Sequence, residues 1–353
     1  MTSTPMTLTA RSADDLIAAA PLVLGFHPVD SVVMMTSDGG HPFQARADLP
    51  TDADPADAPR LTAEVLVDAA RRNRVHRLAL LFYADDERRV RPVWRALQRA
   101  CRQARLEVVA SFRVEPRRYY PLLGARRLRE IGVAYDVSAH PFVAEAVMRG
   151  IVVEHDRAAL AARLAPDPAA QAAVQAVVER ERLETTPGPR KGEERLRWLD
   201  RLAAAVVDHL VAGTPIGDAD LARLLWLLQD AACRDVLSAL VRRADARAHQ
   251  EFWLDVVRRA PDRFAPAPAA LLAWSAYQAG HGAVAWMAID RCREVHEHHP
   301  LAELVARCLE DAIPPDAFAG MDEDDPADEL GWDDEDDDRW DDEDCEWDEG
   351  LPA

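Results

Sequence analysis

The chain has 353 residues, with 42 Lys and Arg against 62 Asp and Glu, and only 6% of its residues are aromatic, which suits a protein of about two domains. Much of the negative charge belongs to residues 321–353, where 19 acidic residues accompany a single arginine. The remaining residues carry nearly equal numbers of acids and bases, so the net charge of −20 describes a tail and says little about the folded domains.

No apolar run is long enough to cross a membrane, and residues 1–15 lack the basic and apolar regions of a signal peptide. We therefore expect a cytoplasmic protein. The five cysteines are widely spaced and form no Cys-x-x-Cys pair, so the sequence predicts neither a disulfide framework nor a zinc ribbon. We expect no metal and no cofactor.

Strand and helix patterns alternate in the first part of the chain. Ser12 and Asp15 have the spacing of a capping box, which predicts a helix that Pro21 ends. The next elements predicted are strands at 31–36 and 43–49, a helix at 61–72, a strand at 77–83, a helix at 90–105 and a strand at 106–114. This alternation favours a three-layer α/β domain with a mixed sheet.

The pattern becomes helical after residue 139, with helices predicted at 139–149 and 157–164 and successive amphipathic helices from 196 onward. Leu272, Gly280, Ala285 and Cys292 have the spacing of a tetratricopeptide-like helix pair, although a generic helical bundle explains them equally well. The predicted organisation is an α/β domain (8–165), a linker region with a helix (166–195), an all-α helical domain (196–316) and a disordered acidic tail containing tryptophans (317–353).

The segment from Leu24 to Val33 has a distinctive sequence. The segment Leu24-Gly25-Phe26-His27-Pro28-Val29-Asp30-Ser31-Val32-Val33, together with Ala45 to Pro50, resembles the actinobacterial family called domain of unknown function 4192. Less specific likenesses continue through Asp245 to His249 and Pro268 to Ala273, so the resemblance covers about residues 8–316. It implies a family without an assigned function. Members often carry neighbouring cysteines before a Pro-x-Gly segment, but residues 119–135 of this chain have none, which puts thiol or metal chemistry there in doubt.

The loop that carries the resemblance is also a candidate ligand site. His27, Asp30 and Ser31 offer polar groups directly before a predicted strand, and Gly25 and Pro28 restrict the backbone between them. A structural explanation competes with this one, because Asp and Ser often satisfy backbone groups at such corners.

Arginines are concentrated in residues 71–129, which hold 17 Arg against five acids. The candidate anion-binding residues are Arg88, Arg95, Arg99, Arg117 and Arg118, with Tyr119 and Tyr120 beside the last two. Arginine binds phosphates and carboxylates in pairs of hydrogen bonds, and aromatic rings can stack on bases. The alternative is that these arginines simply line the wet face of a helix.

Two further groups of residues are candidates. Cys292 and His296 are four residues apart, a spacing that can place two metal ligands on one helix face, but a packed cysteine near a polar helix end explains them better. In the tail, Trp332, Trp340 and Trp347 each precede two acidic residues. Such units can dock on a basic surface of a partner or of this protein, or they can belong to a solubilising end.

We therefore expect a non-enzymatic interaction or regulatory protein with an acidic docking tail and no membrane association. Two alternatives stay open. One is a nucleotide-binding protein or enzyme with a pocket in the α/β domain, and the other is nucleic-acid binding through residues 71–129.

Overall fold

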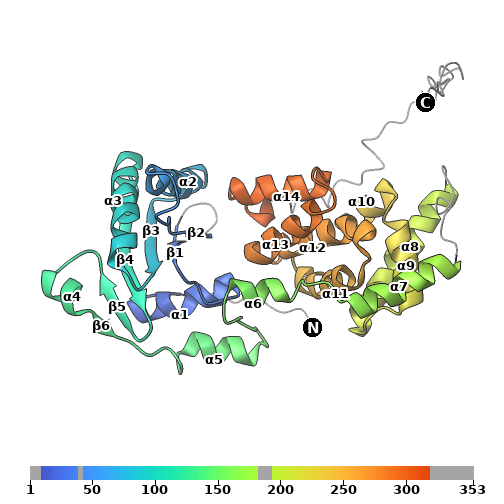
Figure 1. Ribbon diagram of the computed structural model, residues 1–353, viewed down its shortest axis with the longest axis horizontal. Helices are drawn as coiled ribbons and strands as arrows, with labels where there is room; N and C mark the ends of the chain where they lie inside the picture. The colour runs from blue at the N-terminus through green and yellow to red at the C-terminus, as the bar shows by residue number, and fades with distance from the viewer. Residues whose placement is uncertain (1–8, 39–42, 182–192, 319–353) are drawn as a thin grey trace, which may run out of the picture. The chain divides into compact units, whose positions relative to one another are not determined.

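The N-terminal part of the chain forms one sheet of six strands. The structure is a computed structural model that describes residues 9–38, 43–181 and 193–318 (Figure 1). The strands are β1 (Ser31–Thr36), β2 (Gln44–Asp48), β3 (Arg77–Tyr83), β4 (Glu107–Glu115), β5 (Arg118–Pro121) and β6 (Val133–Ala134). Their order in the sheet is β2-β1-β3-β4-β5-β6. β3 and β4 are parallel and every other neighbouring pair is antiparallel, so the sheet is mixed.

Helices accompany the sheet and then make up the rest of the described chain. In the first part they are α1 (Ala13–Leu24), α2 (Ala58–Arg72), α3 (Glu87–Ala104), α4 (Arg126–Ile131), α5 (Pro141–Met148) and α6 (Arg157–Ala162). They continue as α7 (Pro168–Glu181), α8 (Glu193–Ala212), α9 (Asp218–Leu227), α10 (Ala231–Ala239), α11 (Ala246–Arg259), α12 (Pro266–Gln278), α13 (Gly282–Arg293) and α14 (Pro300–Glu310), with short 3-10 helices η1 (Asp262–Phe264) and η2 (Pro315–Phe318). The expected α/β fold followed by helices is confirmed.

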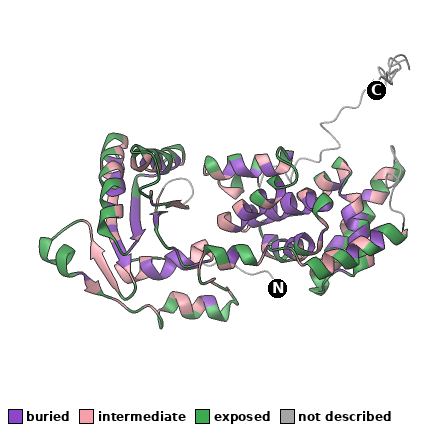
Figure 2. Cartoon of the chain, in the orientation of Figure 1, coloured by how far each residue is buried: buried purple, intermediate pink, exposed green. Residues whose placement is uncertain are grey.

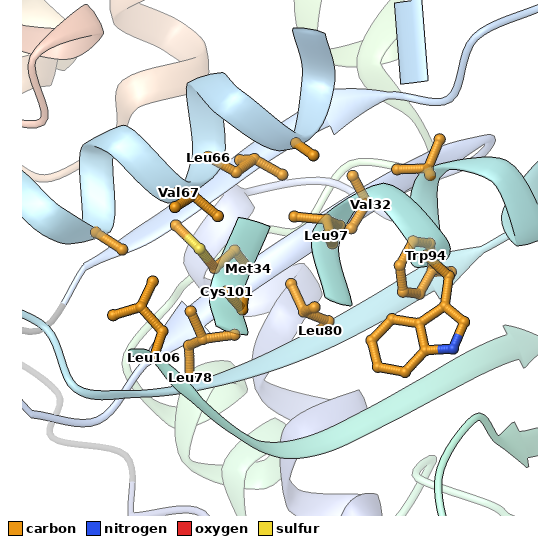
Figure 3. Packing of buried hydrophobic residues seen from close by; sticks show 14 of the residues in the cluster. Val32, Met34, Leu66, Val67, Leu78, Leu80, Trp94, Leu97, Cys101 and Leu106 are labelled. Carbon is orange, nitrogen blue, oxygen red and sulfur yellow. The ribbon is translucent and has the colours of Figure 1, made fainter. Parts of the chain in front are cut away.

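The larger core of the α/β part lies between the sheet and helices α2 and α3. Alternation along β1 directs Val32 and Met34 to this face, where they pack with apolar residues of β3 and of both helices (Figure 3). Phe82 of β3 meets Trp94 of α3 edge to face, with ring centroids 6.1 Å apart. α3 is therefore fixed on the sheet by one apolar side.

The opposite face of the sheet is covered by α1. Ser12 and Asp15 form the predicted capping box at the start of this helix. The prediction that Pro21 ends the helix is wrong, since α1 continues to Leu24 and stops at Gly25, whose φ of 79° is left-handed. Pro21 is buried within the last turn, and burial there offsets the one helical hydrogen bond that proline cannot donate.

Beyond β4 the chain forms an arm that the sequence analysis did not predict. We call residues 116–135 the arm; it contains β5, α4 and β6. Gly132 has a φ of 70°, and a Cβ at this position would lie 2.8 Å from the ring of Tyr120. The arm therefore needs glycine at this position, both for the backbone angle and for space.

The chain up to Asp316 forms one compact unit, so the boundary expected between residues 165 and 196 stays a prediction. α12 is buried along its whole length, as Figure 2 shows, and packs on α11, α13 and α14. α12 and α13 are joined by a turn at Gly280, and Leu272, Ala285 and Cys292 are fully buried between helices. This arrangement suits a close helix pair; it does not distinguish a tetratricopeptide repeat from a bundle.

No helix among residues 9–38, 43–181 and 193–318 is long and apolar enough to cross a membrane.

Buried histidines make the stability of the helical part sensitive to acid. Burial lowers the pKa of His281 and of His299 to about 4, and neighbouring arginines add to the effect. Both rings are thus neutral in the folded protein, whereas the unfolded chain binds protons near the ordinary pKa of about 6.5. The contribution of the two neutral rings to the free energy of unfolding is therefore complete above about pH 6.5 and is lost as the pH falls toward 4.

We predict that the free energy of unfolding decreases over this pH range by an amount on the order of 2 kcal/mol per ring. The side-chain oxygen of Gln250 lies 2.6 Å from Nδ1 of His281, and His281→Gln keeps a polar group for this contact. The variant should make the free energy of unfolding depend less on pH. Urea unfolding at several pH values measures this. The exposed His155→Gln is the control, and equal pH slopes in both variants would contradict the assignment.

Candidate functional site: the strand ends and the arginine face of α3

The carboxyl ends of β3 and β4 lie at the same edge of the sheet, because these strands are parallel. The amino end of β1 and the carboxyl end of β2 reach this edge too, since β1 runs antiparallel to both of its neighbours. The loop that precedes β1 and the first turn of α3 complete it. In open α/β sheets this is the edge at which ligands bind.

The predicted trio His27, Asp30 and Ser31 does not converge at this edge. The carboxylate of Asp30 pairs with Nη1 of Arg89 on α3 at 2.6 Å, while Nη2 of Arg89 donates to the carbonyl of Leu49 at 3.2 Å. Asp30, at a φ of 46°, also accepts the backbone N–H of Leu49 at 2.8 Å. Asp30 thus ties the loop to α3 and to the end of β2.

The other two members of the trio lie elsewhere. Ser31 is fully buried and follows the alternation of Val33, so its side chain faces α1, and its Oγ has no hydrogen-bond partner among the described residues. His27 is exposed and donates its backbone N–H to Glu154 at 3.0 Å. Partial loss of water and the nearby His155 lower the pKa of His27.

A buried arginine network at the strand ends was missed by the sequence analysis. Arg113 of β4 is 8% exposed and faces the same side of the sheet as α3. Its Nη1 donates to the carbonyl of Asp85 at 3.1 Å and pairs with Glu115, and its guanidinium lies 4.1 Å from the ring centroid of Tyr120. Tyr120 in turn donates its hydroxyl to Glu115 at 3.3 Å. The sequence feature that could have revealed this network is an arginine at a strand position that faces the interior.

α3 carries a row of exposed arginines on the side away from the sheet. We call Arg88, Arg95, Arg99 and Arg102 the arginine face of α3. Spacings of three, four and seven residues put them on one side of the helix. None of the four pairs with a carboxylate in the described parts of the chain; Arg99 and Arg102 instead donate Nε to carbonyls of α3 itself. This face is cationic and open to water.

Other exposed arginines are of two kinds: some pair with a carboxylate, and others, such as Arg105 and Arg127, have no carboxylate partner among the described residues. Arg60 pairs with Glu64 at 2.6 Å, Arg126 with Glu130 at 2.7 Å, and Arg149 with Glu145 at 2.7 Å, each one helical turn away. On α3 the same spacing supplies only Glu87 for Arg91, at 3.5 Å. An uncompensated cluster of like charges is mildly unfavourable for the folded protein and favourable for binding anions.

Arg117 and Arg118, the other two candidate anion-binding residues, lie at the turn between β4 and β5. Arg117 is exposed and has a φ of 69°. Nη1 of Arg118 donates to the carbonyls of Ile131 and Gly132 at 2.7 and 3.3 Å, so this side chain holds the arm. Only Arg117 of the two is thus as open as the arginine face of α3.

The remaining candidates do not join this region. Cys292 is fully buried in α13, and burial raises the pKa of its thiol to about 12, so the thiol is neutral. The backbone N–H of His296 bonds the carbonyl of Cys292 at 2.9 Å. In the described parts of the chain no group of His, Cys, Asp and Glu could hold a metal ion. Trp332, Trp340 and Trp347 lie outside the described residues.

We predict that Arg113→Met lowers the free energy of unfolding by about 2–4 kcal/mol, because the partly buried Glu115 loses its partner. Adding Glu115→Gln to Arg113→Met should restore part of that loss. Urea unfolding measures both. Arg88→Met, which removes an exposed arginine, is the matched control and should change stability by less than about 0.5 kcal/mol. Equal losses in the two single variants would refute the network.

Comparison with known proteins supports one assignment. The family described as a domain of unknown function, DUF4192, matches residues 14–316. No curated protein and no solved structure matches the chain. The match covers most of the chain and includes both the sheet and the helices that follow. The protein therefore belongs to the DUF4192 family.

Proposed function

We propose that this protein is a cytoplasmic, non-enzymatic interaction protein that binds an acidic polypeptide through the arginine face of α3. The observation that carries the proposal is an arrangement: four exposed arginines lie on one side of α3, and none of them has a carboxylate partner in the described residues. Guanidinium groups at helical spacing suit carboxylates spaced along a second chain.

The positions of the tyrosines favour an acidic polypeptide over a nucleic acid. Binding of single strands relies on aromatic rings that stack on bases. Tyr120 is covered by Arg113, and Tyr119 packs on Phe112 with centroids 5.0 Å apart, on the face of the sheet covered by α1. Nucleic-acid binding through this segment would then rest on phosphate contacts alone.

The alternative of an enzyme or nucleotide-binding protein places the chemistry in the loop before β1. The geometry favours it less, because Asp30 is held by Arg89, Ser31 faces α1 and His27 lies beside Glu154. A reaction site needs its groups within hydrogen-bond reach of one another or of one substrate atom.

The acidic tail fits the same proposal as a second docking device. Its charge attracts it to basic surfaces over long distances, and its tryptophans can anchor in apolar grooves. On a basic surface of this protein the tail would compete with an acidic partner; on another protein it would recruit that partner.

We predict that replacing Arg88, Arg95 and Arg99 together with Gln weakens binding of poly-glutamate about 10- to 30-fold at low salt, since three uncompensated charges are lost. Fluorescence anisotropy with a labelled probe measures the affinity. The matched control replaces Arg60, Arg126 and Arg149 with Gln; these arginines are also exposed but are paired, and the net charge changes by the same amount. Equal weakening in both triple variants would contradict the proposal.

Single-stranded DNA is the second probe in the same assay. The proposal expects weaker binding to DNA than to poly-glutamate of equal charge. Preferential binding to DNA, with an affinity that falls steeply as salt rises, would favour the nucleic-acid alternative instead.

We also predict that a chain ending at Gly320 binds poly-glutamate more tightly than the full chain, by about 3- to 10-fold at low salt, because the many acidic residues of 321–353 no longer repel the anionic probe. The difference should vanish near 0.5 M salt. An unchanged affinity would show that the charge of the tail does not affect binding at the arginine face of α3.

A further inference from the structure

A groove between α8 and α9 has a shape and chemistry that the proposed function does not use. Its volume is about 440 Å³, and its floor is formed by Leu202, Val206, Ile216 and Leu224, all of which are buried. Trp198 of α8 lines it as a partly buried ring. The groove is large enough to take an aromatic side chain.

Charged side chains surround this apolar floor. Arg201 of α8 and both Arg223 and Asp220 of α9 line the groove. Arg201 is exposed and has no carboxylate partner among the described residues, while Arg223 is shared between Glu181 at 3.1 Å and Asp220 at 3.2 Å. The occupant that fits is an apolar ring flanked by carboxylates.

We infer that the tail of this chain docks in the α8–α9 groove through one of its Trp-acidic units, with the indole on the apolar floor and the adjacent carboxylates toward Arg201. Each unit combines the two required groups, since Trp332, Trp340 and Trp347 are each followed by two acidic residues. This inference rests on the proposed role of the tail as a docking device and names the surface that receives it.

The tail is attached near enough to reach this groove. Asp316, two residues before the end of the described chain, pairs with Arg243, just beyond α10. α10 packs against α8, and its capping residue Asp230 binds Arg195 of α8 at 2.8 Å. The chain from Asp316 to Trp332 spans up to about 50 Å when extended. Attachment also raises the local concentration of the tail to about the millimolar range.

A second cavity beside α9 fits the tail less well. It lies between α7, α9 and η1 and is about 610 Å³ in volume. Arg263, the cationic residue that lines it, already covers the ring of Phe264 at 4.6 Å and so is less open to a carboxylate of the tail than Arg201 is.

Cys345 lies between Trp340 and Trp347 and provides a way to test the inference in the full chain. The other four cysteines, Cys101, Cys233, Cys292 and Cys308, are buried. A thiol-specific photocrosslinker can therefore be attached at Cys345 without further substitution. After illumination at low protein concentration, mass spectrometry identifies the residues that it reaches. We expect crosslinks within the same molecule to residues 198–227.

Two variants of α8 differ by one position and make the test specific. Ala205 lines the groove and is exposed, so Ala205→Glu adds bulk and negative charge at its mouth. Ala204 is also exposed but does not line the groove, and Ala204→Glu is the matched control. Crosslinking to residues 198–227 should fall about fivefold or more in the first variant and remain in the second. Equal melting temperatures confirm that both variants are folded.

The outcomes separate this inference from the proposed function. Crosslinks that map to α3 would overturn the groove assignment and leave a docking tail in place. Crosslinks only between molecules, or none above background, would overturn docking within the chain. Crosslinking that is insensitive to Ala205→Glu would also overturn the groove as the site.

Discussion

The structure of the α/β part depends on one connection, the crossover from β3 to β4. Parallel strands cannot be joined by a tight turn, so α3 must run back along the sheet between them. Packing Trp94 and Leu97 against the sheet determines which side of α3 faces water. The arginines on that side follow from this orientation: the hydrophobic contact that holds the helix also presents its basic row outward.

Two kinds of arginine result, and they differ in what surrounds them. Arg113 is enclosed by carbonyl groups, a carboxylate and an aromatic ring, so its charge is satisfied by contacts within the fold. Arg89 likewise ties Asp30 and the end of β2 to α3. The arginine face of α3 has no carboxylate partner among the described residues, and the presence of four such side chains on one side of a helix supports a binding role.

The helical part adds a different type of surface. Its core is centred on α12, which is buried from end to end, whereas α8 and α9 leave an apolar groove lined by two arginines and an aspartate. The arginine face of α3 and the α8–α9 groove are thus two surfaces that suit an acidic and aromatic segment. The tail has both of these chemical properties, which links the composition of residues 321–353 to the surfaces of the rest of the chain.

Much of the sheet could be predicted from local pattern. β1 and β3 lie at their predicted bounds, because apolar and β-branched runs bounded by polar residues indicate buried strands directly. α3 begins three residues before its predicted start, since the cap at Asp86 gave no periodic signal. The arm was missed because β5, α4 and β6 are short and Arg-rich, so they have too few residues to show a period.

The candidate site was less predictable than the fold. That Arg88, Arg95 and Arg99 share a helix face follows from their spacing, but the lack of partners depends on which acids the fold brings near them. The separation of Asp30 from Ser31 also needed the structure, because alternation at the start of β1 turns one side chain toward α1 while the other meets α3. The α8–α9 groove depends on how two successive helices pack against each other, which the pattern of either helix alone does not show.

The most direct test of the central claim is a titration of the full chain with poly-glutamate, followed through the NMR signals of the arginine Nε–H groups. Our account predicts shifts concentrated at Arg88, Arg95, Arg99 and Arg102 at low salt, which disappear as salt is raised. Shifts spread equally over paired arginines such as Arg60 and Arg126, or no shifts, would contradict it.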